Sequence, residues 1–410
     1  MPPTPETAHA PHASAIARLA FPHGYVTLPT GTGAVLHQEL YRSDNLVVRR
    51  VGFRGGTVII TFGSYTNVPD LDRAGFGEEF LRRGRIDAIH VINRYNRWYQ
   101  HPDTREAVAA VAAAARRYDR AITYGSSMGG YAALRYATPC RADTVIAVSP
   151  QHTVDPRLCP WETRWQPDVA NTAFEELPYV PAPTQYVFYD PRVKLDSRHV
   201  DAIERAGRTI RIPVPYAGHP VGALLVETGA LQSAIRAIVA GDFDPRDVMA
   251  QVRRERRVSQ HRYYVLARRA SKRRPALAEK LLAAAAAIEP ESHILSAQAV
   301  LLDRLGRSEE AAPLHRAAIR RTPHNSLAWM GYAGHLEKTG DRAQAAQALR
   351  SAVPGQSGSM LLRIRTMQLR MWLRRHHLSA IDRLFGRIIG WIERSPYQAA
   401  ILRRVGLRLR

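Results

Sequence analysis

The sequence has 410 residues, 45% of them hydrophobic and 23% charged, which is enough chain for two or three domains of a globular protein. Its two cysteines, Cys140 and Cys159, lie in no metal-binding or redox spacing, which argues against a disulfide framework and favours a reducing, cytoplasmic compartment. The net charge of +22 is uneven, because Lys and Arg number 26 against 23 Asp and Glu up to Asp242, but 32 against 13 from Phe243 onward.

Residues 1–20 are rich in Pro, Ala and Thr and have no basic stretch followed by a long apolar core. We therefore expect a flexible leader there rather than a signal peptide. No run of about 18 apolar residues occurs in the chain, so the sequence predicts no membrane-spanning helix.

Residues 21–242 alternate between strand-like and helix-like segments. Continuous apolar strands between helices predict an α/β fold with a mostly parallel sheet covered by helices on both faces. The expected strands are 34–42, 45–53, 57–64, 86–93, 121–125, 144–150, 184–190 and 209–216, and the expected helices are 104–118, one starting at Gly129, 200–206 and 222–241.

Residues 151–183 interrupt this alternation with six prolines and little periodicity. An insertion of this length between two core strands is often a functional loop. We expect either a lid over the site or a simple surface excursion.

The second half is expected to be all helical after a linker at 243–258. Gly306 and Gly340 lie 34 residues apart, and Ala311 and Ala345 repeat that interval. The spacing resembles the tetratricopeptide repeat, a pair of helices with small residues where they cross. The resemblance implies three units within 259–357, at 259–291, 292–325 and 326–357.

The segment 358–410 carries 12 Arg against one Asp and one Glu, with apolar residues interleaved. Amphipathic helices of this kind can cap a helical repeat array, which we favour, or contact an anionic membrane from one side.

One short stretch carries a chemical signature. The residues Gly125–Ser126–Ser127–Met128–Gly129 match G-x-S-x-G, with a predicted strand before them and a predicted helix after them. In this context the motif resembles the nucleophile elbow of the α/β-hydrolase superfamily. The resemblance covers about 21–242 and implies that Ser127 is a nucleophile.

A serine needs a base, and the resemblance implies the chain order Ser, Asp or Glu, His. We assign His219, after the last predicted strand, as base and Asp190, at the end of the strand 184–190, as its orienting acid. Asp196 is the rival acid and His199 the rival base.

Donors for an oxyanion are expected at the backbone of Met128, the residue after the nucleophile, and at Ser64 or Tyr65 in the loop after the strand 57–64. Four further residues follow strand ends and are candidates for the substrate pocket or for ordinary loop packing: Trp98, Tyr99, Gln151 and His152.

These residues predict a serine hydrolase that acts on a small-molecule or glycan acyl ester, and the helical repeats predict a docking surface for an acidic protein. An acyltransferase on the same scaffold and a non-catalytic interaction protein are the alternatives. No metal-ligand or phosphate-loop spacing is present, so no metal or cofactor is expected. The basic half lacks a base-reading motif, which argues against a nucleic-acid partner.

Overall fold

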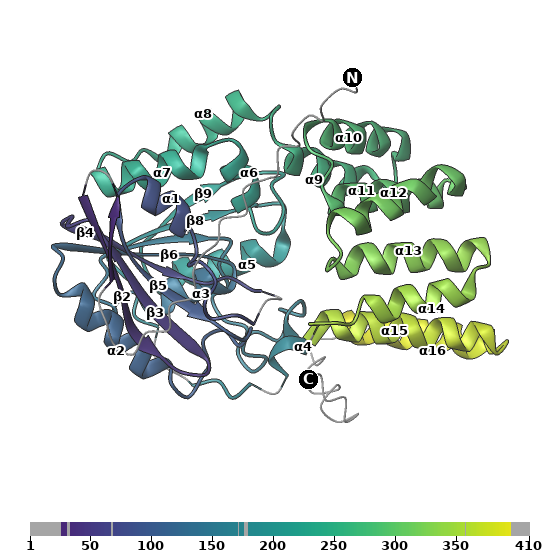
Figure 1. The fold of residues 1–410 in the computed structure, drawn as a ribbon, viewed down its shortest axis with the longest axis horizontal. Helices are drawn as coiled ribbons and strands as arrows, with labels where there is room; N and C mark the ends of the chain where they lie inside the picture. The colour runs from purple at the N-terminus through teal and green to yellow at the C-terminus, as the bar shows by residue number, and fades with distance from the viewer. Residues whose placement is uncertain are drawn as a thin grey trace, which may run out of the picture.

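The computed structural model describes residues 26–30, 33–66, 69–170, 172–175, 179–356 and 358–394, so the expected leader lies outside the described residues. Figure 1 shows two regions side by side, a domain built on a twisted sheet and an array of stacked helices. The α/β class with an all-α second region, expected from the sequence, is confirmed.

Within the described residues, nine strands form one sheet in the order β1-β2-β3-β5-β4-β6-β7-β8-β9. The strands from β5 through β4 to β9 are mutually parallel, whereas β1, β2, β3 and β5 pair antiparallel. This is the α/β-hydrolase type of sheet. The strands are β1 (Val26–Thr30), β2 (Gly33–Arg42), β3 (Leu46–Gly52), β4 (Thr57–Phe62), β5 (Asp87–Asn93), β6 (Arg120–Ser126), β7 (Thr144–Val148), β8 (Thr184–Tyr189) and β9 (Thr209–Pro213).

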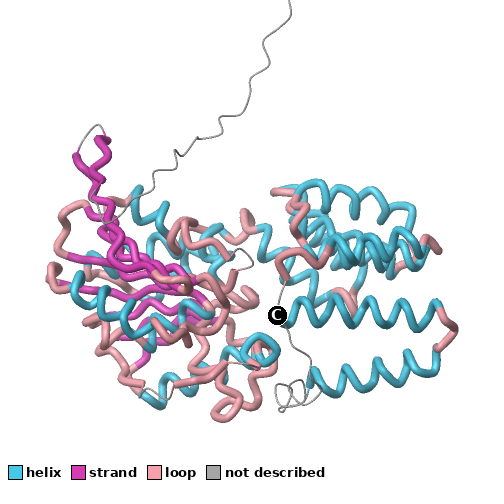
Figure 2. Tube along the Cα trace, turned by 60° about the horizontal axis from the view of Figure 1, so that its bottom comes forward, coloured by secondary structure: helices cyan, strands magenta, loops and turns pink. Residues whose placement is uncertain are grey.

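Helices cover both faces of the sheet (Figure 2). Side chains along a strand point alternately to opposite faces. In β4, Ile60 and Phe62 join one core with helices α2, α3 and α5, while Ile59 joins another core with α1, α6, α7 and α8. The helices of this domain are α1 (Glu78–Arg83), α2 (Thr104–Ala115), α3 (Met128–Arg135), α4 (Gln166–Val169), α5 (Lys194–Ala206), α6 (Gly222–Glu227), α7 (Ala230–Ala240) and α8 (Pro245–Glu255).

Two expected boundaries differ from the structure. The helix expected over 222–241 is two helices, because Gly229 between them takes a left-handed backbone with φ of 70°. The segment expected to be a linker, 243–258, is mostly α8. Asp244 caps this helix, and Val248 and Val252, one turn apart, are buried in the core of the sheet domain.

The array consists of consecutive antiparallel helices (Figure 1). The small residues at the expected crossing points, Ala311 and Ala345, are buried, and Gly306 and Gly340 end helices in the left-handed conformation. The tetratricopeptide identity of the pairs stays a prediction. The helices are α9 (Gln260–Ala270), α10 (Pro275–Ile288), α11 (Ser292–Arg304), α12 (Ser308–Arg321), α13 (Ser326–Thr339), α14 (Arg342–Ser351), α15 (Gly358–Arg375) and α16 (Ser379–Arg394).

The basic segment begins with α15 and α16 after the last expected unit, and residues 395–410 lie outside the described part. Within the described ranges, we find no helix whose length and apolarity would let it cross a bilayer.

Candidate active site

Ser127 lies at the sharp turn between β6 and α3, with φ of 52° and ψ of −115°. A backbone of this kind is strained in a non-glycine residue and persists only where its surroundings enforce it. A Cβ on Gly125 would lie 2.1 Å from the carbonyl oxygen of Gly129, and one on Gly129 would lie 2.3 Å from that of Phe62. The two motif glycines are therefore required by close backbone approach.

Ser127, His219 and Asp196 form a hydrogen-bonded chain. The Oγ of Ser127 lies 3.0 Å from Nε2 of His219, and Nδ1 of His219 lies 2.8 Å from Oδ2 of Asp196. An ionised carboxylate only accepts, so Nδ1 carries the proton and Nε2 is left to accept from the serine hydroxyl. All three side chains are largely buried, with Ser127 only 6% exposed.

The acid that contacts His219 is therefore Asp196, not the favoured Asp190. Asp190 is fully buried at the end of β8, where its carboxylate accepts from the backbone N–H groups of Gly218 (2.8 Å) and Arg192 (2.9 Å). Asp196 lies in the first turn of α5, and this position brings its carboxylate within hydrogen-bond distance of the imidazole of His219. Position after a strand predicts the neighbourhood of a side chain, but the turn into α5 decides which carboxylate reaches the imidazole.

Asp196 has a second partner from the insertion. Its Oδ1 accepts from Nη1 of Arg164 (2.8 Å), and Arg164 also pairs with Glu162 (2.6 Å). Glu162 in turn lies 2.8 Å from Nε2 of His199, the rival base, which is thereby engaged away from Ser127. Burial opposes the charge of Glu162, but hydrogen bonds from His199 and Arg164 outweigh it and lower its pKa to about 2. Sequence reasoning missed both Glu162 and Arg164.

A buried amide lies beside the serine. Nε2 of Gln151 donates to Oγ of Ser127 (3.2 Å), and Oε1 of Gln151 accepts from the indole N–H of Trp98 (3.0 Å). Because an indole nitrogen can only donate, Trp98 fixes the orientation of the amide. Two of the four predicted pocket residues are thus brought to the site.

The other two pocket candidates lie elsewhere. Tyr99 is buried in the core, where its hydroxyl donates to the carbonyl oxygen of Gly63 (2.8 Å). His152 packs edge-on against Tyr179 at 5.7 Å, and burial lowers its pKa to about 4. Among the described contacts, neither makes a hydrogen bond or ring contact with the serine or histidine of the site.

An aromatic wall flanks the histidine. The ring of Trp165, from the insertion, lies 5.9 Å from that of His219, 5.6 Å from Trp98 and 5.7 Å from Tyr65. Apolar rings beside a hydroxyl and an imidazole reduce access of water and provide a surface for an apolar group. The sequence analysis did not identify Trp165 as part of the site.

The expected oxyanion donors lie around the same turn. Met128 is the first residue of α3, where backbone N–H groups lack partners within the helix. The hydroxyl of Ser64 donates to the carbonyl oxygen of Ser126 (2.8 Å), and that of Tyr65 to Asp168 (2.8 Å). Those hydroxyls therefore hold the loop in place, and backbone donation from Ser64 or Tyr65 stays a prediction.

In the part of the chain that the structure describes, one group of side chains could hold a metal ion: Asp303, His315 and His335, whose ligand atoms lie within 4.8 Å of one another. They come from α11, α12 and α13, so no short sequence spacing revealed them. Each imidazole lies 2.9 Å from one oxygen of Asp303, so both rings are hydrogen-bonded to the carboxylate, while Nδ1 of His315 is buried without a hydrogen-bond partner among the described residues.

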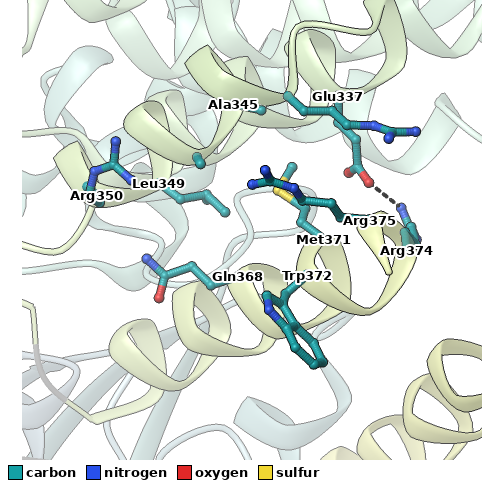
Figure 3. A pocket seen from close by; sticks show the side chains of 11 residues that line it. Glu337, Ala345, Leu349, Arg350, Gln368, Met371, Trp372, Arg374 and Arg375 are labelled. Atoms are coloured by element: carbon teal, nitrogen blue, oxygen red, sulfur yellow. Dashed lines mark hydrogen bonds and ion pairs between the residues drawn. The ribbon is translucent and has the colours of Figure 1, made fainter. Parts of the chain in front are cut away.

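The array carries a separate groove of about 380 Å³ between α13, α14 and α15. Figure 3 shows Leu349, Met371 and Trp372 among guanidinium groups, and one of these, that of Arg374, pairs with Glu337 at 3.2 Å. The lining is Glu337, Arg342, Ala345, Ala346, Leu349, Arg350, Gln368, Met371, Trp372, Arg374 and Arg375.

No protein-family model matches the chain. A comparison with curated proteins likewise finds no match. Solved structures similar to it include the capsule O-acetyltransferase of Neisseria meningitidis serogroup A, with 10% identity, a TM-score of 0.32, and coverage of 52% of this chain and 98% of that one.

A second similar structure is Est1E from Butyrivibrio proteoclasticus, with 12% identity, a TM-score of 0.33, and coverage of 50% of this chain and 98% of that one. A third is the fluorophosphonate-binding serine hydrolase F of Staphylococcus aureus, with 11% identity, a TM-score of 0.31, and coverage of 57% of this chain and 99% of that one. At these identities and scores, function has to be argued from the geometry around Ser127.

Proposed function

We propose that the protein is a serine hydrolase that cleaves a small-molecule or glycan acyl ester through an acyl-enzyme, with Ser127, His219 and Asp196 as its catalytic residues. The observation that carries this is the hydrogen-bonded chain from Oγ of Ser127 to Oδ2 of Asp196, at 3.0 and 2.8 Å. A turn or loop without a catalytic role would not require a serine, a histidine and an aspartate to be hydrogen-bonded in series at the carboxyl ends of the parallel strands.

In this mechanism Oγ of Ser127 attacks the acyl carbonyl carbon while its proton passes to Nε2 of His219. The tetrahedral oxyanion accepts a hydrogen bond from the N–H of Met128 and from a second backbone donor in the loop of Ser64 and Tyr65. Collapse of this intermediate breaks the ester bond, and His219 returns the proton to the leaving alkoxide. Water, deprotonated by His219, then releases the acyl group.

Acyl transfer on the same residues is the second candidate. It is favoured by the enclosure of the site, because Ser127 is 6% exposed and Trp165 covers His219 from the insertion. A hydroxyl acceptor would then replace water in the second half-reaction.

Docking of an acidic protein segment is proposed for the groove of α13, α14 and α15, whose apolar floor lies among Arg342, Arg350 and Arg375. The membrane alternative rests on α16, where Ile381, Leu384 and Ile388 are 44–54% exposed on a helix that also carries arginines.

The test is covalent labelling of the full chain by a fluorophosphonate probe. We expect labelling of the wild type, no labelling of Ser127→Ala, and labelling slowed by ~10³-fold or more in His219→Ala and Asp196→Asn. Asp201→Asn, on the exposed side of the same helix α5, is the matched control. No labelling of folded wild-type protein would overturn the proposal, and unchanged labelling of Asp196→Asn would remove that residue from it.

A further inference from the structure

Helix α9, the first helix of the array, lies against the loop that carries His219. His261, Val265 and Arg269 are spaced four apart and share one face of α9. Nε2 of His261 lies 2.8 Å from the carbonyl oxygen of Ala217, so that nitrogen carries the proton.

The other two contacts follow along the same face. A side chain of Val265 packs so closely on Gly218 that a Cβ there would lie 3.2 Å from it. The guanidinium of Arg269 lies over the ring of Tyr216, 5.6 Å from its centre. Successive turns of α9 therefore contact the three residues that directly precede His219.

The loop of residues 216–218 has an unfavourable backbone conformation. Tyr216 and Gly218 both have left-handed backbones, with φ of 66° and 73°. A left-handed backbone is unfavourable for a non-glycine residue such as Tyr216, so contacts from outside the loop must maintain it. Those contacts include the carboxylate of Asp190 and the guanidinium of Arg192, which lies 4.5 Å from the centre of the Tyr216 ring, on one side and α9 on the other.

The start of α9 is also fixed to the chain after His219. Glu227, at the end of α6, accepts from the hydroxyl of Ser259 and from the backbone N–H of His261 (3.1 Å). Figure 1 shows α9 next to α6 at the junction of the two regions. Helix α9 thus contacts the chain on both sides of His219.

We propose that α9 positions the catalytic histidine, with His261 as a positioning residue, and that the helical array is therefore part of the catalytic unit in addition to the docking role proposed for its groove. This inference rests on the proposed function, in which His219 is the base. The far end of the array touches the site's surroundings as well, because α15 packs beside α4 of the insertion that carries Trp165.

The test uses the full chain, with kcat and KM on a p-nitrophenyl acyl ester, the pH dependence of kcat, and the rate of fluorophosphonate labelling. For His261→Ala we expect kcat and labelling to fall ~10-fold or more with little change in KM, because small displacements of a catalytic group are costly. We also expect the pH at which kcat declines on the acid side to differ between His261→Ala and the wild type. His261→Gln, which keeps a donor for the carbonyl of Ala217, restores most of the rate.

A second test compares two variants that each remove one arginine from the same helix, α9. Arg269→Ala removes the contact that α9 makes with Tyr216 and leaves that of Arg192, whereas Arg268, which lies beside Tyr264 instead, can be changed to alanine without loss of a contact to the loop. We expect only the former to lower kcat, and this pair decides the matter if His261→Ala does not fold.

Wild-type kcat and pH profile in His261→Ala, or equal effects of the two arginine variants, would overturn the role of α9. Those results differ from a wild type that no fluorophosphonate labels, which would overturn the proposed function instead.

Discussion

The amide of Gln151, like the ring of His219, lies within hydrogen-bond distance of the serine hydroxyl. In the proposed mechanism, negative charge grows on Oγ as the proton leaves Ser127, and the N–H of Gln151 at 3.2 Å would stabilise that charge. We expect Gln151→Glu, which keeps the shape but loses the donor, to lower kcat by ~10²-fold with a small change in KM.

The measurement is steady-state kinetics on a p-nitrophenyl acyl ester. Gln100→Glu is the matched control, because that amide donates to the hydroxyl of Tyr131 (2.9 Å) and not to the serine. A Gln151→Glu enzyme with wild-type kcat would show that the amide only packs beside the nucleophile.

At this scale the sequence predicted the serine and the histidine that lie in hydrogen-bond contact, but it favoured Asp190 over Asp196, the carboxylate that contacts the histidine. Gly125 and Gly129 mark Ser127 because the close backbone approach admits no side chain. The choice between Asp190 and Asp196 depends on the direction in which α5 leaves the strand, and no residue pattern encodes that direction.

Among the elements, the insertion 151–183 is anchored to the site by a buried ion pair. Arg164 bridges Glu162 and Asp196, so the insertion and α5 are held together at the orienting acid. We expect Arg164→Gln to lower kcat ~10-fold, because Asp196 loses one of the two partners that fix its carboxylate. Removing a positive charge also favours protonation nearby, so the acid limb of the kcat profile moves to higher pH.

Arg157→Gln provides the control for this prediction, because Arg157 pairs with Asp155 in the same insertion and its side chain is 60% exposed. Equal kcat profiles for the two variants would contradict the prediction. The composition of the insertion revealed that it interrupts the fold. The insertion is anchored by the contacts of Glu162 with His199 and of Arg164 with Asp196. Composition cannot predict these contacts, because the residues of each pair lie more than 30 positions apart in the sequence.

At the scale of the whole molecule, the net charge of the sequence changes near Asp242, but this change in composition does not coincide with the boundary between the two packed regions. Helix α8 follows that point and still packs Val248 and Val252 into the sheet domain. The period of 34 residues predicted helix pairs, since it depends on local packing. The contact of His261 with Ala217 depends on the angle at which the array leaves α8, which the sequence pattern does not fix.

Buried histidines set the response of the sheet domain to acid. Burial lowers the pKa of His90, His101 and His152 to about 4. In the unfolded chain these groups titrate near 6.5. Since the unfolded state binds more protons between those values, the stability that the neutral rings contribute is complete above pH 6.5 and is lost as the pH falls toward 4.

We therefore expect the free energy of unfolding to fall by about 1.4 kcal/mol per pH unit for each of these histidines between pH 6 and 4.5. Denaturant unfolding at several pH values measures that slope. His152→Gln should reduce it by about that amount, because the glutamine takes up no proton on unfolding. His324→Gln, at an exposed position of the array, should leave the slope unchanged. If both variants keep the wild-type slope, His152 binds its proton in the folded state and its burial does not govern acid stability.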